Sequence, residues 1–109
     1  IKTSSGALAR IPLCRVENLK YAVNYLKASG LAIVSISEKG NRSFSDVDFT
    51  GPIALILGSE ENGINKALLR LSDVICFIPM MGNIDSLNVS VAGGIAMYEV
   101  VRQRINKNP

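Results

Sequence analysis

The stretch Leu31-Ala32-Ile33-Val34-Ser35-Ile36 is an almost unbroken apolar run that is rich in β-branched residues. Such a run predicts a β-strand covered on both faces, because a strand with one face in water alternates apolar and polar residues. Two more buried strands are predicted at residues 53–57 and 74–78, and a short strand at residues 11–16. Sheet formation therefore dominates the expected architecture.

Segments with helical periodicity separate these runs. The first helix is predicted after Asn18, a suitable N-cap, and it ends at Gly30. A shorter helix is predicted at residues 64–71, and residues 37–50 are expected to form a loop that contains a short helical turn. Strands that alternate with helices predict an α/β domain, with a parallel sheet flanked by helices.

The last helix is expected from about Ser86 to Gln103. One of its faces is apolar and is expected to pack on the sheet; it consists of Leu87, Val91, Ile95, Tyr98 and Val101. A second face is made of small residues, namely Ala92, Gly93, Gly94 and Ala96. Small residues admit a second backbone closely, so this face is predicted to form a homodimer interface; the alternative is that the glycines serve close packing within one chain.

The composition is that of a globular core, since 48% of the 109 residues are hydrophobic and 19% are charged. No apolar run approaches the ~20 residues that a membrane helix needs, which predicts a cytoplasmic protein with no membrane partner. The net charge of +3 weakly favours a polyanionic partner. Arg102, Arg104 and Lys107 near the C-terminus can either contact phosphate or complement the helix dipole.

The chain contains no histidine, which excludes histidine-based acid–base catalysis and histidine zinc ligands within these residues. No metal is predicted. Cys14 and Cys76 both lie in apolar runs, with no second cysteine at metal-ligand spacing. We expect two buried free thiols rather than a disulfide.

A turn bounded by glycines follows the strand predicted at residues 53–57. Its sequence is Gly58-Ser59-Glu60-Glu61-Asn62-Gly63, which matches neither the phosphate-binding P-loop nor the dinucleotide fingerprint. Open α/β sheets bind ligands at the carboxyl ends of their strands, and glycine lets a ligand approach the backbone closely. The residues alone favour a structural turn over a ligand site, with Glu60 as a carboxylate at the N-terminus of a helix dipole.

A second polar motif precedes the last helix. Ile78-Pro79-Met80-Met81-Gly82 ends the third strand, and Ser86-Leu87-Asn88-Val89-Ser90-Val91-Ala92 begins the helix. The Ser86 hydroxyl can cap this helix, and the Asn88 amide can bind a loop carbonyl or a ligand. Met80 and Met81 can pack against either a ligand or the core.

In order and spacing, these two motifs resemble the middle and last signature motifs of the SpoU (TrmH-type) RNA ribose 2′-O-methyltransferases. The RlmB-like branch, which methylates guanosine in bacterial ribosomal RNA, is the nearest likeness. The resemblance implies that residues 1–109 are the C-terminal portion of the family's catalytic domain. It also implies an α/β knot, in which the C-terminal segment is tucked through a preceding loop as a trefoil.

The resemblance further implies the cofactor S-adenosylmethionine, an RNA substrate (ribosomal RNA, with transfer RNA as the alternative) and a homodimer. Backbone groups at the cofactor-binding positions would hold the cofactor, and these positions are Gly58, Ile78, Met80 and Leu87. The positions expected to organise the methyl-transfer site are Glu60, Ser86 and Asn88, and Ser35 is a further candidate for the cofactor rim.

The chain departs from the family pattern at one point. The first SpoU motif, which carries an arginine thought to help activate the 2′-hydroxyl, is absent, so the 109 residues alone are expected to be inactive. Arg10 and Arg15 lie outside any such motif. A non-catalytic RNA-binding or scaffold module that keeps the fold is the alternative, and an unrelated nucleotide-binding domain is disfavoured because both phosphate-loop patterns are missing.

Overall fold

A parallel four-stranded sheet forms the centre of the protein, in a computed structural model that describes residues 2–5, 10–13, 19–58, 63–79 and 89–107. Its strands are β3 (Ala32–Ile36), β4 (Arg42–Ser43), β5 (Ile53–Leu57) and β6 (Val74–Phe77). They lie in the order β4-β6-β3-β5, and every pairing in this sheet is parallel. The predicted parallel sheet is confirmed.

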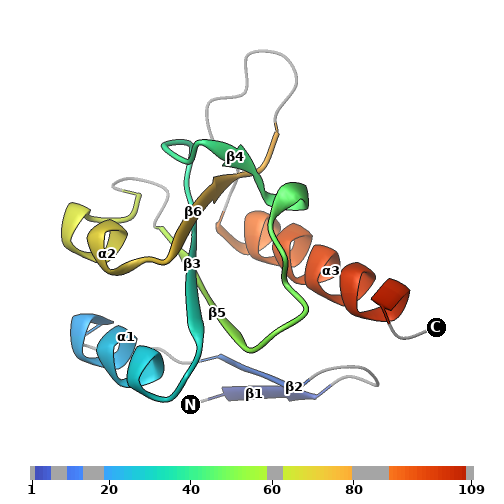
Figure 1. Ribbon diagram of the computed structural model, residues 1–109, viewed down its shortest axis with the longest axis horizontal. Helices are drawn as coiled ribbons and strands as arrows, with labels where there is room; N and C mark the ends of the chain where they lie inside the picture. The colour runs from blue at the N-terminus through green and yellow to red at the C-terminus, as the bar shows by residue number, and fades with distance from the viewer. Residues whose placement is uncertain (1, 6–9, 14–18, 59–62, 80–88, 108–109) are drawn as a thin grey trace.

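Helices cover both faces of this sheet (Figure 1). They are α1 (Leu19–Ala28), α2 (Lys66–Leu71) and α3 (Val89–Lys107), and a short 3-10 helix, η1 (Phe44–Asp46), follows β4. In Figure 1, α1 and α2 lie on one side of the strands and α3 lies on the other. Two apolar clusters match these layers, one beneath α3 and one beneath α1 and α2.

Local sequence explains where the helices begin and end. The helix α1 buries Val23 and is followed by Gly30, whose φ of +93° favours glycine. Asn65 caps α2, because its side-chain oxygen accepts a hydrogen bond from the backbone N–H of Leu68 at 2.9 Å. The helical turn expected within residues 37–50 is η1, and β4 lies beside it.

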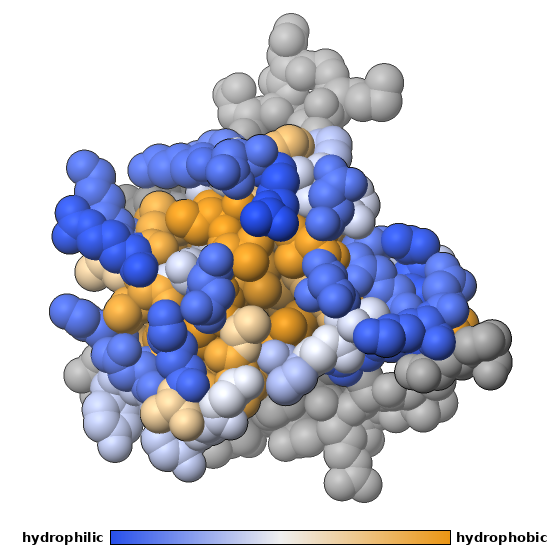
Figure 2. Space-filling view, in the orientation of Figure 1, coloured by the Kyte–Doolittle hydropathy of each residue, from blue (hydrophilic) through white to orange (hydrophobic). Residues whose placement is uncertain are grey.

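The three predicted buried strands differ in how well they are covered. Four of the five residues of β3 are buried, as predicted. All five residues of β5 are only half-buried, because within the described residues β5 is an edge strand that pairs with β3 alone. The strand β6 is also mostly half-buried, since β4 pairs with it only at Cys76 and Phe77. Figure 2 accordingly shows an apolar surface in the middle of the view, over the strands.

A second, two-stranded sheet was not anticipated. In it, β1 (Lys2–Ser5) pairs antiparallel with β2 (Arg10–Leu13), so the strand predicted at residues 11–16 begins one residue earlier. The polar residues of β1 give no periodic apolar signal, because this strand is defined by its pairing rather than by its own side chains.

The prediction that the apolar stripe of the last helix packs on the sheet is wrong. Three members of the expected stripe are exposed rather than packed on the sheet: Val91 (50% exposed), Ile95 (36%) and Tyr98 (69%). The face that contacts the sheet carries Gly93, Ala96 and Val100 instead. Small side chains let the helix backbone approach the sheet closely. The packing gained by this close approach outweighs the burial of the larger apolar side chains of the stripe. The helix extends to Lys107, four residues beyond the expected end.

Candidate functional site

The carboxyl ends of β3, β5 and β6 meet at one edge of the sheet. Ile36 pairs with Leu57 on one side and with Cys76 on the other. Beyond it, the backbone N–H of Ser37 donates to the carbonyl oxygen of Cys76 at 2.8 Å. Gly58 and Ile78, which follow β5 and β6, therefore flank the end of β3, at the edge where parallel α/β sheets bind ligands.

Gly58 occupies a position where only glycine fits. A Cβ atom added there would lie 2.6 Å from the backbone nitrogen of Ile64, closer than real Cβ contacts. Gly63, which precedes Ile64, has a φ of +64°. The chain after β5 thus returns tightly onto Gly58 before α2 begins. This contact supports the structural interpretation of Gly58, and it also places the start of α2 at the carboxyl edge.

Gly40 is a constrained glycine at the same edge that sequence analysis missed. Its N–H donates to the carbonyl oxygen of Ser37 at 3.0 Å, which closes a turn directly after β3. A Cβ atom at Gly40 would lie 2.6 Å from two backbone atoms of Cys76. The turn therefore packs against β6 two residues before Ile78. Only the close packing of the two segments singles out this glycine among the loop residues.

The first turns of α3 reach the same edge. A Cβ atom at Gly93 would lie 3.1 Å from Cδ1 of Leu57, the last residue of β5. Gly93 is buried, whereas a Cβ at Gly94 would meet nothing within 4 Å. The described start of α3 is thereby held beside the end of β5 and Gly58.

Ser35 directly precedes Ile36 in β3, and its side chain lies in the interior. It is completely buried, and its hydroxyl oxygen is 2.5 Å from that of Ser72. Since the Ser72 hydroxyl donates to the carbonyl oxygen of Leu68 at 2.9 Å, the Ser35 hydroxyl is the donor to Ser72. Its hydrogen bond thus ties β3 to the end of α2. Among the described residues, we find no contact that would place Ser35 on the rim of a ligand site.

The other predicted site residues lie outside the described part of the chain. They are Glu60, Met80, Ser86, Leu87 and Asn88. The structure therefore brings together Gly58 and Ile78, and the roles assigned to the remaining five positions stay predictions. The path of the expected knot also depends on segments outside the described residues.

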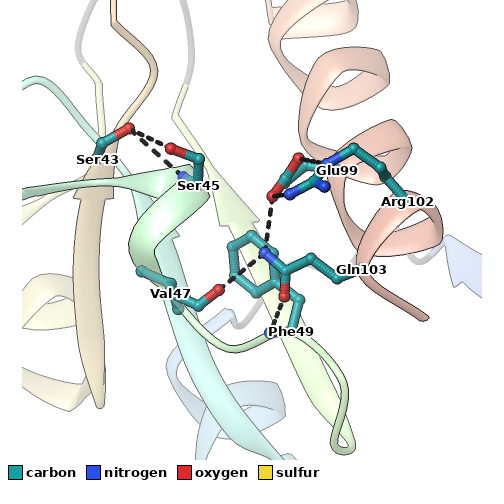
Figure 3. A network of polar contacts seen from close by, with 7 residues as sticks. All are labelled: Ser43, Ser45, Val47, Phe49, Glu99, Arg102 and Gln103. Atoms are coloured by element: carbon teal, nitrogen blue, oxygen red, sulfur yellow. Dashed lines mark hydrogen bonds and ion pairs between the residues drawn. The ribbon is translucent and has the colours of Figure 1, made fainter. Parts of the chain in front are cut away.

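The basic residues near the C-terminus hold a loop of the protein itself. Arg104 donates to the carbonyl oxygens of Phe49 (3.2 Å) and Gly51 (2.9 Å), and Lys107 donates to Thr50 Oγ1 (3.1 Å). Arg102 donates to both carboxylate oxygens of Glu99, at 2.7 and 2.8 Å (Figure 3). These contacts give the three cations structural partners within the chain.

Gln103 completes this polar network. Its side-chain nitrogen donates to the carbonyl oxygen of Val47 at 2.9 Å and to Glu99 at 2.7 Å. Its side-chain oxygen accepts from the backbone N–H of Phe49 at 2.7 Å (Figure 3). Glu99 is only 6% exposed, and its hydrogen bonds with Arg102 hold the pKa of this carboxyl below its ordinary value. The network fastens α3 to the segment that leads into β5.

The described part of the chain offers no thiol nucleophile and no metal site. Cys76 is a buried free thiol, as predicted, and burial raises its pKa to about 11 although Arg42 acts in the opposite direction. Cys14 is not among the described residues. Those residues contain no group of three or more metal-ligating side chains, and none of their helices is long and apolar enough to span a membrane.

Comparison with known proteins defines the class. The chain belongs to the SpoU rRNA Methylase family, whose model matches residues 1–98. It is 40% identical over 103 residues to the 23S rRNA (guanosine-2′-O-)-methyltransferase RlmB of Coxiella burnetii, covering 94% of this chain and 41% of that protein. It is 39% identical, over 94% of the chain and 33% of the relative, to an uncharacterized tRNA/rRNA methyltransferase of Mycobacterium leprae.

Solved structures agree with this membership. The A. aeolicus TrmH/SpoU tRNA modifying enzyme superimposes with a TM-score of 0.76 at 38% identity, over 84% of this chain and 47% of that one. The SpoU methyltransferase AviRb of Streptomyces viridochromogenes, solved with the cofactor AdoMet, gives a TM-score of 0.71 at 37% identity, over 81% and 36%. The parallel α/β fold with flanking helices is therefore confirmed as that of SpoU methyltransferases, and the chain spans less than half the length of each of these relatives.

Proposed function

We propose that this chain is the cofactor-binding portion of an S-adenosylmethionine-dependent RNA methyltransferase that modifies a ribose 2′-hydroxyl. The observation that carries the proposal is the meeting of Gly58, Ile78 and the start of α3 at one carboxyl edge. The two family motifs adjoin this same edge. The constrained glycines support this proposal because they let the segments after β3 and β5 pack tightly at this edge, where backbone groups would bind the cofactor.

S-adenosylmethionine would supply an activated methyl group with its leaving group already in place. The residues of the chain then have two tasks, to align the 2′-oxygen with the methyl carbon and to help remove the hydroxyl proton. We assign backbone binding of the cofactor to Gly58, Ile78, Met80 and Leu87. We assign organisation of the transfer site to Glu60, Ser86 and Asn88, and no metal enters this scheme.

The favoured substrate is a guanosine of ribosomal RNA, because the Coxiella burnetii relative is a 23S rRNA (guanosine-2′-O-)-methyltransferase. Transfer RNA is the alternative, because the A. aeolicus relative is a tRNA modifying enzyme. A ribose 2′-hydroxyl distinguishes RNA from DNA at the reacting atom itself. An enzyme with either substrate would work in the cytoplasm.

The test uses the intact protein that contains residues 1–109. Calorimetry is expected to detect binding of S-adenosylmethionine, with no competition by ATP or NAD. Methyl transfer to ribosomal RNA is expected to stop when the target nucleotide carries a 2′-deoxyribose. Competition by NAD at comparable concentration would reject the cofactor assignment. Binding of RNA without methyl transfer would favour the non-catalytic alternative.

Asn88→Ala separates the catalytic role from the capping role. Turnover is expected to fall because the geometry of the transfer site changes, with only a modest loss of stability from a helix-terminal hydrogen bond. Unchanged turnover with a lower melting temperature would assign Asn88 to capping alone. Ser86→Ala, measured in the same assays, separates the catalytic role of Ser86 from its capping role in the same way.

We also propose a homodimer. Its interface would be the exposed stripe of Val91, Ile95 and Tyr98, and not the face of small residues predicted from the sequence. The support is that Gly93 and Ala96 pack inside the chain while the stripe faces solvent. Light scattering of the intact protein at micromolar concentration should give a dimer, and Ile95→Glu with Tyr98→Glu should give a monomer. A monomeric wild type would refute the dimer, and a dimeric double variant would move its interface elsewhere.

A further inference from the structure

Two tyrosines stand exposed on the outer face of α1. Tyr21 is 71% exposed and Tyr25 is 64% exposed. They are four residues apart, so their side chains lie on the same face of the helix, one turn from each other. The opposite face, which carries Val23, packs against the sheet. Two large aromatic rings thus face solvent side by side.

Basic side chains lie on both helices of this layer, and the sequences of these helices contain no acidic residue. The sequences of α1 and α2 contain Lys20, Lys27, Lys66 and Arg70 and no aspartate or glutamate. Lys20, Lys66 and Arg70 are exposed. Figure 2 shows hydrophilic residues gathered at the left margin of the view, where α1 and α2 lie in Figure 1.

Lys27 joins the two helices into one surface. Its ammonium nitrogen donates to the carbonyl oxygen of Leu71 at the end of α2 (2.8 Å) and lies 3.5 Å from a carboxylate oxygen of Asp73. Because Asp73 also accepts from the backbone N–H of Ile33 at 2.7 Å, its charge is held at the base of this layer. Among the described residues, the exposed cations of α1 and α2 therefore leave these two helices with a net positive charge.

We propose that this α1–α2 face, formed by Lys20, Tyr21, Tyr25, Lys66 and Arg70, binds a single-stranded RNA segment next to the methylated nucleotide. The inference rests on the proposed function, since it names where that enzyme holds its RNA. Exposed aromatic rings stack on unpaired bases of any sequence, and neighbouring cations bind the backbone phosphates. This combination fits RNA better than a protein partner, for which the apolar stripe of α3 is the more suitable surface.

The position of α2 connects this face to the cofactor edge. The segment that leads into α2 packs on Gly58, because a Cβ atom at Gly58 would lie 2.6 Å from the backbone nitrogen of Ile64. Lys66 is the first residue of α2 and so lies at the end nearest the edge, whereas Arg70 lies one turn further away. An RNA strand that follows these two cations would run toward the carboxyl ends of the strands, where methyl transfer is proposed.

The first experiment measures the affinity of the intact protein for an unstructured oligouridine of twelve nucleotides. Replacing Tyr21 and Tyr25 by alanine is expected to weaken binding by at least about fivefold per tyrosine, because each loses a base stack. Tyr21→Phe and Tyr25→Phe keep the ring and should bind like the wild type. Tyr25→Trp should show fluorescence quenching when RNA is added, which reports stacking directly.

The second experiment tests the cations through salt dependence. Lys66→Ala combined with Arg70→Ala should make the slope of log affinity against log salt concentration shallower by about 1.4, the value for two lost phosphate contacts on a single strand. Lys107→Ala, at the far end of α3, is the charge-matched control and should leave both slope and affinity unchanged. An effect of Lys107→Ala equal to that of one face lysine would overturn the assignment.

S-adenosylmethionine binding, measured by calorimetry in every variant, separates the two hypotheses. If the wild type binds the cofactor and the alanine variants bind RNA as tightly as the wild type, the α1–α2 face is refuted while the proposed function stands. If the wild type binds RNA through this face and no cofactor, the methyltransferase assignment fails and the RNA site remains. Loss of RNA affinity with retained cofactor binding supports both.

Discussion

The two faces of the central sheet are covered in different ways. On the α3 side, a large apolar cluster surrounds the fully buried Phe49, and Gln103 fastens the helix to the loop that leads into β5. On the α1–α2 side, the cluster is smaller, built around Ile33 and Leu68, and a hydroxyl pair and Asp73 make the polar ties. The first face is closed by a single long helix and the second by two short ones.

The outer surfaces of these helices differ as well. The exposed side of α3 is an apolar stripe, whereas that of α1 and α2 combines tyrosines with cations. Apolar surface suits another protein surface, and aromatic rings among cations suit nucleic acid. The comparison teaches that the helices on the two faces of one sheet present two chemically distinct surfaces to solvent.

The largest expected effect is at the centre of the α3 face. Phe49→Ala in the intact protein should lower the free energy of unfolding by about 3–5 kcal/mol, because it removes a fully buried ring and leaves a cavity. Leu68→Ala, on the opposite face, should cost less since its side chain is smaller and 5% exposed. Urea unfolding measures both, and a greater loss for Leu68→Ala would reverse the ranking of the two faces.

A second prediction concerns the polar attachment of α3. Gln103→Ala leaves the carbonyl oxygen of Val47 and the N–H of Phe49 without their partner, and it should cost about 1–3 kcal/mol. Lys107→Ala, which removes only an exposed hydrogen bond to Thr50, should change stability by less than about 0.5 kcal/mol. Equal losses in the two variants would show that the network contributes little.

The adjacent glycines of α3 provide a matched pair. Gly94→Ala should stabilise the protein by about 1 kcal/mol through helix propensity, because nothing lies within 4 Å of the added Cβ. Gly93→Ala gains the same propensity but must displace Leu57 Cδ1, which would be 3.1 Å away, so its net gain should be smaller. Thermal unfolding of the two variants distinguishes them, and identical gains would contradict close packing on β5.

The smallest expected effect is on acid stability. Arg102 holds the pKa of Glu99 below its ordinary value of 4.5. A carboxyl with a lowered folded-state pKa contributes stability above its unfolded pKa and loses it as the pH falls through the folded pKa. Stability should therefore decline below about pH 4.5, and Glu99→Gln should make that decline shallower. A variant whose unfolding free energy depends on pH as steeply as the wild type's would exclude Glu99 as a contributor.

Much of the fold could be predicted from local patterns. The β-branched run of β3, the cap at Asn65 and the terminating Gly30 all act through their own side chains or backbone conformation, so they appear in the sequence as a period or a residue type. The pairing of β1 with β2 and the coverage of β5 depend on distant neighbours. The periodicity of a strand's own sequence does not indicate which distant segments will be its neighbours.

The candidate site divides in the same way. Gly58 and Ile78 were predicted from motifs, and the parallel register of β5, β3 and β6 explains why they meet at one edge. Gly40 was missed because its constraint comes from the backbone of Cys76, which is 36 positions away in the chain. Ser35 was only a candidate for the cofactor rim, and its hydroxyl donates to Ser72 inside the protein, a contact that its sequence position does not indicate.

The sequence by itself determined the family, the parallel α/β architecture and the strand ends that form the candidate site, because these follow from local residue patterns and short motifs. Only the tertiary structure decided which side of α3 is buried. Hydrophobicity favoured the stripe of Val91, Ile95 and Tyr98, but the buried side carries Gly93, which packs beside Leu57, and Ala96. The buried Glu99 on that side is bound by Arg102 and Gln103, and Arg102 neutralises its charge. Packing distance and charge pairing are properties of two segments together, and neither segment alone contains them.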